Sequence, residues 1–183
     1  HCVIGDFSIM SELRTNRIVP RDGLPSGASG GIVQIVQASD DTQITTSSIT
    51  PTAIVSATIT PTSASNKILI QYTAAASFDG GASHANTCIL RGSTKIAAAD
   101  SGTGSGEAFR ANKTLYEDNG STDGNNMNSL SGSFLDSPAT TSSITYAVGG
   151  FSNSNSYSCA FNRRLSSTSY GQVSEIILME ITG

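Results

Sequence analysis

Only one histidine stands where it could act as a catalytic base. The chain has two histidines, and His1 is the first residue, which leaves His84 in the segment Gly-Gly-Ala-Ser-His-Ala-Asn. Asp79 lies five residues upstream, but nucleophilic catalysis also needs a positioned nucleophile. The serine of Gly102-Thr-Gly-Ser-Gly106 has the wrong offset for a nucleophile elbow. These residues favour a loop histidine; a catalytic base, or a metal ligand shared by symmetry-related copies, is the alternative. We expect no catalytic residue and no enzymatic activity.

Oxygen ligands gather between residues 117 and 125, a segment that includes Asp118 and Asp123. An EF-hand loop that began at Asp118 would need a glutamate at its twelfth position, where the chain has Ser129. The segment is therefore expected to be an exposed polar loop, with an irregular calcium site as the alternative. Glu175 and Glu180 are expected to be strand-edge or outward residues rather than a pair of catalytic acids. The sequence predicts no cofactor and no bound metal.

Flat amphipathic side chains lie beside several polar segments and could form a recognition surface. An arginine pair close to a tyrosine could hold an anionic glycan, although strand-end tyrosines and a solvated arginine pair are the alternative that the pattern favours. The predicted exposed recognition loops carry Tyr116, Asp118, Asp123, Tyr157, Arg163, Arg164 and Tyr170.

The composition excludes several classes of protein. Only 13% of the residues are charged, about half of the roughly 25% that is usual, whereas Ser and Thr together number 50 of 183. The net charge of −4, with only 10 Lys and Arg, argues against nucleic-acid binding. No unbroken apolar run is longer than Ile176 to Met179, which is much shorter than the ~18 residues of a membrane helix. We expect no membrane insertion.

Three segments can be separated along the chain. Residues 1–9 precede Met10 and are expected to be a leader whose origin the sequence does not identify. Residues 10–30 show no strand or helix period and are repeatedly broken by Pro and Gly, which predicts an extended docking arm. Its basic residues are Arg14, Arg17 and Arg21, flanked by acidic residues. Residues 31–183 are expected to form one head domain.

The head has the texture of an all-β chain. Short β-branched runs predict strands near 31–37, 42–47, 52–60, 66–76, 86–91, 94–98, 108–116, 129–135, 142–149, 157–162 and 173–182. Several runs alternate, so that Val55, Ala57 and Ile59 share one face of a strand. The expected fold is a jelly-roll-like antiparallel β-sandwich (C1q/TNF-like), preceded by the arm.

The first and last strands of the head break this alternation, because both of their faces are apolar. In a two-layer sandwich the second face then needs a cover, which is either a neighbouring subunit or the N-terminal arm. A subunit interface is favoured, and the two strands are expected to pair side by side. The predicted interface residues are Ile32, Val33, Ile35, Val36, Ile176, Ile177, Leu178 and Met179.

The three cysteines, Cys2, Cys88 and Cys159, match neither a disulfide framework nor a zinc-binding pattern. Cys88 and Cys159 lie inside strand-like runs and are expected to be small core residues, with a bridge between them as the alternative.

Five runs of the sequence carry a resemblance to a known group of proteins. They are MSELRTNRIVPRDGLPSGASGGIVQIVQ from Met10, SNKILIQYTAAAS from Ser65, LRGSTKIAAAD from Leu90, SGSFLDSPATTSSITYAV from Ser131 and EIILMEI from Glu175. Together they resemble short virion proteins of marine and cyanobacterial tailed phages, described as tail-fibre or structural proteins. The Asn-Arg-Arg segment at 162–164 also looks like a feature of this group.

The resemblance implies a non-enzymatic structural protein on the exterior of a virion. It would be a tail-fibre or adhesin module, or a capsid decoration (knob), with an arm that docks to other virion proteins and a head that is a homotrimer. A host-surface glycan is a candidate partner. The alternative from another class is a secreted carbohydrate-binding or C1q-like recognition module of a cell.

Overall fold

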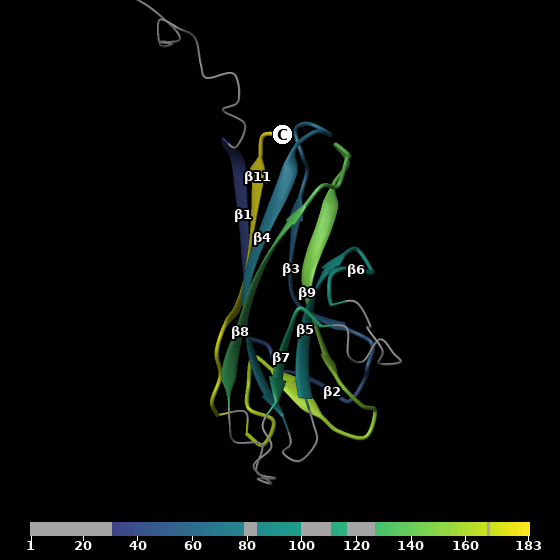
Figure 1. The fold of residues 1–183 in the computed structure, drawn as a ribbon. Coiled ribbons are helices and arrows are strands. Elements are labelled where there is room, and N and C mark those ends of the chain that lie inside the picture. Colours follow the sequence, from purple (N-terminus) through teal and green to yellow (C-terminus); the bar gives the residue numbers. More distant parts are fainter. Residues whose placement is uncertain (1–30, 79–83, 100–110, 117–126, 168) are drawn as a thin grey trace, which may run out of the picture.

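The computed structural model describes residues 31–78, 84–99, 111–116, 127–167 and 169–183, which form two packed β-sheets (Figure 1). The strands are β1 (Ile32–Asp40), β2 (Ile44–Thr46), β3 (Thr52–Ile59), β4 (Lys67–Phe78), β5 (His84–Arg91), β6 (Thr94–Ala97), β7 (Lys113–Tyr116), β8 (Asn128–Asp136), β9 (Ile144–Ser152), β10 (Cys159–Phe161) and β11 (Ser174–Ile181). Within these residues no helix is long and apolar enough to cross a membrane. The predicted all-β class is confirmed.

The strand order is that of a jelly roll. The six-stranded sheet has the order β1-β11-β4-β10-β2. β11 and β10 pair with successive parts of one edge of β4, and β8 pairs with the opposite edge. The five-stranded sheet runs β3-β9-β5-β6, and β7 also pairs with β5. When the strands other than β2, β6 and β10 are numbered one to eight in chain order, the two sheets become 1-8-3-6 and 2-7-4-5, the arrangement of two interleaved Greek keys. The described pairs are antiparallel, as expected.

The alternation in the sequence places the core between the sheets. Val55, Ala57 and Ile59 of β3 are buried, as predicted, and face the six-stranded sheet. On β4 and β11 the buried residues follow the same period of two, with Ile68 and Ile70 on one strand and Ile176 and Leu178 on the other. One continuous apolar cluster therefore fills the space between the two layers.

At one point the packing of the core requires a residue without a side chain. A Cβ atom on Gly150 would lie 2.5 Å and 2.7 Å from two ring atoms of Phe161, closer than real Cβ contacts come. Gly150 is in β9 of one sheet and Phe161 is in β10 of the other. The glycine therefore lets an aromatic ring fill the space between the sheets.

The cysteines of the head are core residues, as expected. Cys159 belongs to the central cluster, whereas Cys88 belongs to a smaller cluster with Leu90, Ala147 and Phe151 on the outer side of the five-stranded sheet. Both are fully buried and are not bridged to each other. The alternative of a Cys88–Cys159 disulfide is therefore wrong.

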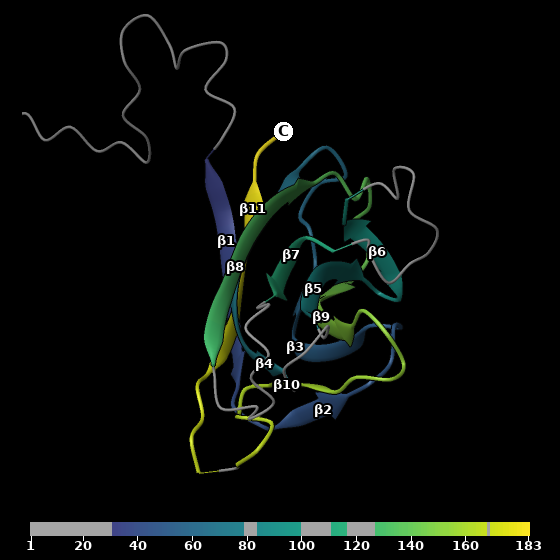
Figure 2. The same ribbon diagram turned by 60° about the horizontal axis from the view of Figure 1, so that its bottom comes forward.

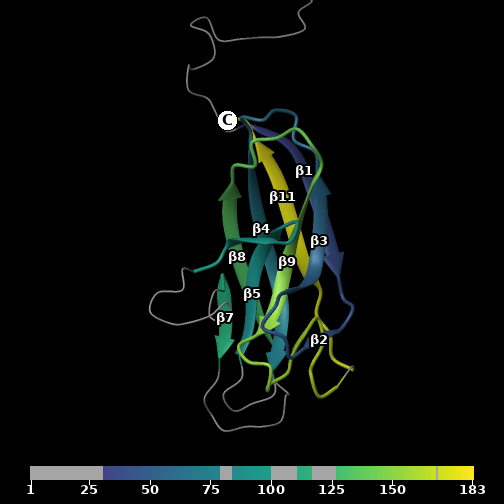
Figure 3. The same ribbon diagram turned by 90° about the vertical axis from the view of Figure 1, so that its right-hand side faces the viewer.

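The first and last strands of the head lie side by side, as predicted, with Ile35 opposite Met179 and Val36 opposite Leu178. This pairing brings the start of β1 and the end of the chain to one end of the sandwich (Figures 1 and 3). The connection from β10 to β11, the end of β7 and the start of β8 lie at the opposite end. We call these the terminal end and the loop end of the head.

Candidate functional site

An apolar row crosses the outer face of the six-stranded sheet. Its four residues come from four neighbouring strands and lie in register. Ile35 is opposite Met179, Met179 is opposite Leu69, and Leu69 is opposite Leu135. Ile35 on β1 is 60% exposed and Leu135 on β8 is 47% exposed. We call these four residues the apolar row, and it lies nearer the terminal end. Figure 3 shows its strands side by side, whereas in Figure 2 β8 crosses in front of β11.

The apolar row is bordered by an almost uncharged surface. Outward positions on β1, β4, β8 and β11 carry only two charged residues, Lys67 near the terminal end and Glu175 nearer the loop end. The next row toward the loop end contains Gln37, Ile177 and Gln71. Depletion of charge around a central apolar patch is typical of surfaces that bind another protein.

The structure divides the eight residues predicted for the interface. Ile32, Val33 and Ile35 are exposed, and Ile177 and Met179 are half-buried at outward positions. The prediction was wrong for Ile176 and Leu178, because both side chains are fully buried in the chain's own core and are inaccessible to a second chain. Val36 also points inward and packs against that core.

Two further residues of this face were missed from the sequence. Leu69 and Leu135 are each the single large apolar residue at an outward position of their strand, so neither strand stood out as apolar on both faces. Only the register between β4, β8 and β11 aligns them with Ile35 and Met179.

Toward the loop end, the same face becomes polar and concave. A hollow of about 560 Å³ is lined by residues that include Gln71, Thr73, Ser131 and Glu175. The Thr73 and Ser131 hydroxyls lie 3.1 Å apart and are hydrogen bonded. The outer face therefore has an apolar half near the terminal end and a hydroxyl-rich half near the loop end.

The predicted recognition residues that the structure describes lie in or beside connections between strands. Tyr116 ends β7 and stacks on His84, with ring centroids 4.4 Å apart and planes 16° from parallel. Tyr157 lies between β9 and β10 and is exposed. This stacking places the only candidate catalytic base against an aromatic ring.

The arginine pair is split by the fold. Arg163 lies 3.6 Å from the carboxylate of Asp41, whereas the guanidinium of Arg164 lies over the ring of Tyr170, 4.6 Å from its centroid. Tyr170 is 62% exposed. Arg164 and Tyr170 line a cavity of about 540 Å³ together with Met127, Ser169, Gly171 and Gln172. We call this cavity the Arg164 cavity.

A buried asparagine shapes the segment that carries these arginines. Asn162 has a φ of 66°, in the left-handed region that asparagine tolerates better than most residues. Its side-chain amide donates to the Thr42 carbonyl at 2.9 Å, and its side-chain oxygen accepts from the Ser174 hydroxyl. Asn162 thus ties the start of the β10–β11 connection to two other segments.

Glu180 was expected to point outward, and this prediction was wrong. It is fully buried, because it is in phase with the inward residues Ile176 and Leu178. Its carboxylate accepts hydrogen bonds from Gln34 Nε2 at 2.6 Å, Asn66 Nδ2 at 2.6 Å, and the Thr62 backbone N–H and hydroxyl at 2.7 and 2.8 Å. Glu175, by contrast, is outward and exposed, as predicted.

These contacts change the acidity of Glu180. Burial alone raises the pKa of the carboxyl, but the hydrogen bonds from Asn66, Gln34 and Thr62 together outweigh it and lower the pKa to about 2. The ionised side chain therefore links the connection between β3 and β4 to the last strand.

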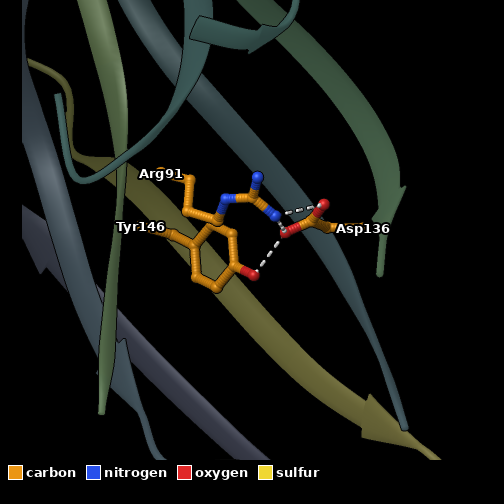
Figure 4. A network of polar contacts seen from close by, with 3 residues as sticks. All are labelled: Arg91, Asp136 and Tyr146. Atoms are coloured by element: carbon orange, nitrogen blue, oxygen red, sulfur yellow. Dashed lines mark hydrogen bonds and ion pairs between the residues drawn. The ribbon is translucent and has the colours of Figure 1, made fainter. Parts of the chain in front are cut away.

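A second polar network ties the two sheets together near the terminal end (Figure 4). Arg91 Nη1 lies 3.1 and 3.0 Å from the two carboxylate oxygens of Asp136, and the Tyr146 hydroxyl donates to Asp136 Oδ2 at 2.6 Å. Arg91 and Tyr146 are opposite each other in the five-stranded sheet, whereas Asp136 ends β8 of the other sheet. Burial, together with the bond to Asp136, holds the pKa of Tyr146 above its ordinary range, so the phenol stays a donor.

The described residues contain no group of three or more His, Cys, Asp and Glu side chains that could hold a metal ion. Several predicted residues lie outside the described ranges, namely Arg14, Arg17, Arg21, Asp118 and Asp123, as do the leader and the arm.

No protein-family model matches the chain, and a search of curated proteins finds no match. The functional conclusion therefore depends on the surfaces described above and on the resemblance of the five sequence runs.

Proposed function

We propose that the chain is a non-enzymatic structural protein of a bacteriophage virion, a tail-fibre or adhesin module or a capsid decoration. In this proposal residues 10–30 dock to other virion proteins, and the sandwich is a display head. Three heads associate through the outer face of the six-stranded sheet, and the loop end faces away from the particle.

The observation that carries the proposal is the apolar row. Exposed Ile35 and Leu135 stand at the two edges of a four-strand surface with few charges, which would favour burial against another chain. A second copy is the occupant that we propose. Each copy presents the same low-charge surface, and a closed ring of copies would cover it without leaving an open face.

The placement of the chain ends supports a role in display. The head begins at Gly31, next to the end of β11, so a docking arm would enter at the terminal end. Tyr116 and Tyr170 belong to the loop end, one sandwich length away. An attachment at one end and exposed aromatic side chains at the other suit a projecting head. The assignment to a virion is supported by the resemblance of the runs from Met10 to Glu175.

The self-association is tested with charge substitutions at exposed positions of the apolar row. We expect light scattering of the whole chain to give three times the chain mass of 18.8 kDa, and Ile35→Glu and Leu135→Glu each to give folded monomers. Ala53→Glu, at an exposed position of β3 in the other sheet, is the matched control and should stay trimeric. A wild-type chain that is folded and monomeric would refute the association.

The virion assignment has a separate test. A cryo-EM map of the intact phage particle should contain the sandwich, with its terminal end against capsid, tail or fibre. Absence of the chain from purified particles would refute the assignment. In that case a stable monomer that binds a glycan through its loops would favour the secreted recognition module.

A further inference from the structure

We propose that the polar hollow on the outer face of the six-stranded sheet binds a neutral glycan. This inference rests on the proposed function and deepens it, because it names a ligand class for the display head. It is carried by the arrangement of polar side chains on the floor of the hollow, by a fixed amide that reaches it from the other sheet and by the charge balance of its lining.

The first step is the floor of the hollow, which is a regular grid of polar side chains. Glu175, Thr73 and Ser131 are opposite one another on three neighbouring strands, β11, β4 and β8. The next row toward the terminal end has Gln71 opposite Ser133. Neighbouring positions on such a face lie about 4.8 Å apart across strands and about 6.8 Å apart along a strand. A sugar, whose hydroxyls both donate and accept hydrogen bonds, would contact several of these groups at once.

The polar groups of this floor are open to a ligand. Gln71, Ser133 and Glu175 are exposed, and none of these three side chains is hydrogen bonded to another residue of the described ranges. The Thr73 and Ser131 hydroxyls are bonded to each other, which uses one of their two hydrogens and leaves the other for a ligand. The floor therefore offers donors and acceptors together, as a polyol requires.

The second step is an amide that reaches the hollow from the other sheet. Asn112 directly precedes β7, and its backbone N–H donates to the Thr87 carbonyl at 2.7 Å. The Tyr72 hydroxyl donates to the side-chain oxygen of Asn112 at 2.8 Å. Gly132, opposite Tyr72 on β8, makes room for this contact, because a Cβ atom there would lie 2.7 Å from the Tyr72 ring.

The contact with Tyr72 fixes which end of the amide a ligand meets. Burial raises the pKa of Tyr72 to about 12, so its hydroxyl stays protonated and can donate to Asn112. The oxygen of the amide is thereby engaged, and the nitrogen is left as a donor in a fixed position. A donor that is held in place before the ligand arrives lowers the entropy that binding must overcome.

The third step is the charge. The lining carries one carboxylate, that of Glu175, and one ammonium group, that of Lys113. The hollow therefore has no net formal charge, and it favours neither an anionic nor a cationic ligand over a neutral one. A single lysine also provides no series of phosphate contacts, which argues against nucleic acid.

The fourth step is the size and polarity of the hollow. A volume of about 560 Å³ is within the usual range for small-ligand sites and would take about one or two sugar rings. Ile177, opposite Gln71, adds an apolar side chain for the C–H face of a ring. The polar floor favours a glycan over a protein partner, since the centre of a protein interface is more apolar and depleted of charge.

The experiment titrates the full chain with defined probes: the neutral disaccharides lactose, maltose and N,N′-diacetylchitobiose, and the acidic 3′-sialyllactose. Calorimetry or saturation-transfer NMR should detect binding of at least one neutral disaccharide, and 3′-sialyllactose should bind no more tightly than lactose. We expect Gln71→Ala to weaken the binding about three- to tenfold, as for the loss of about one hydrogen bond. Ser133→Phe, at an exposed strand position, should fill the hollow and abolish the binding.

Three control variants test whether the hollow of one chain is the site. Gln37→Ala makes the same substitution in the same row of the sheet, two strands from Gln71 and outside the lining, and should leave the affinity unchanged. Tyr170→Leu, in the Arg164 cavity, should also leave it unchanged. The monomer expected from Ile35→Glu should still bind, because one chain supplies the described lining. Circular dichroism confirms that each variant is folded.

The inference is overturned if no neutral disaccharide binds, if 3′-sialyllactose binds more tightly than every neutral probe, or if Gln71→Ala binds like wild type. It is also overturned if Gln37→Ala loses as much affinity as Gln71→Ala, or if Tyr170→Leu abolishes the binding, which would place the ligand in the Arg164 cavity. Loss of binding in a folded Ile35→Glu monomer would show that the site needs a neighbouring chain, and would refute a hollow that binds by itself.

The outcomes for the ligand and for the proposed function are distinguishable. A trimer found in intact particles that binds no neutral glycan would remove this inference alone and leave the proposed function standing. A wild-type chain that is a folded monomer and binds a neutral disaccharide through Gln71 would refute the association and leave this inference standing.

Discussion

Replacing Glu180 by glutamine should destabilise the head strongly for so small a change. The carboxylate faces four donors, from Gln34, Thr62 and Asn66, and one of its oxygens accepts three of them. A glutamine amide keeps the shape but turns one acceptor into a donor, so at least one of the four donors loses its acceptor, and the others lose their charge assistance. Loss of hydrogen bonds to a buried charged group corresponds to about 2–3 kcal/mol.

The dependence on pH follows from the direction of the pKa shift. The folded-state pKa of about 2 lies below the ordinary value of 4.5, so the folded state favours the ionised form. The stabilisation is therefore complete above the unfolded-state pKa and is lost as the pH falls from about 4.5 toward 2. Wild type and Glu180→Gln should differ most near neutral pH and should converge near pH 2.

Urea unfolding followed by circular dichroism, at several pH values from 7 to 2, measures this difference in the free energy of unfolding. Glu175→Gln is the matched control, because it makes the same substitution at an outward, exposed position of the same strand, and it should change the free energy by less than about 0.5 kcal/mol. If the two variants unfold alike at pH 7, or if the effect of Glu180→Gln is the same at every pH, the reasoning is wrong.

Three further outcomes follow from the fold. Asp136→Asn should lower the free energy of unfolding by about 2 kcal/mol, because the half-exposed Arg91 loses its ion pair. Calorimetric melting measures this change, and an unchanged melting temperature would contradict the prediction. Gly150→Ala should lower the free energy of unfolding by about 1–3 kcal/mol, because the new Cβ would collide with the ring of Phe161. Gly31→Ala is the control: its Cβ would meet only an ordinary van der Waals contact, so its melting temperature should be nearly unchanged. Burial raises the pKa of the Cys159 thiol to about 12, so thiol reagents should label this cysteine only after unfolding. Peptide mapping by mass spectrometry measures this, and rapid labelling of Cys159 itself in the native chain would contradict it.

The fold class could be predicted from the sequence because the alternation of apolar and polar residues that indicates it lies within single strands. Alternation along β3 assigned Val55, Ala57 and Ile59 to the core, and the apolar terminal strands were correctly expected to pair. Strand limits were less accurate: the strand expected over 108–116 is described only from Lys113. Ala111 and Asn112 are described and precede the strand, whereas residues 108–110 lie outside the described ranges.

The surface could be predicted only in part, because it depends on register. The sequence indicated Ile35 and Met179 but not their continuation into Leu69 and Leu135, which needs the pairing of four strands that are distant in sequence. Glu180 was misplaced because a charged residue was expected to face water, although its phase with Leu178 pointed inward. Its donors come from segments more than a hundred residues away, so no local pattern shows them.

The central position of β11 has a consequence for how the head is made. It hydrogen bonds to β1 on one side and to β4 on the other, yet it is the last of the described strands to leave the ribosome. Until then the run Ile-Val-Gln-Ile-Val-Gln of β1 lacks its partner, and a chain that stops before Ser174 leaves a gap in the middle of the sheet. Shortened chains would therefore remain open to proteases and to aggregation, so that only chains carrying the last strand could form the closed sheet.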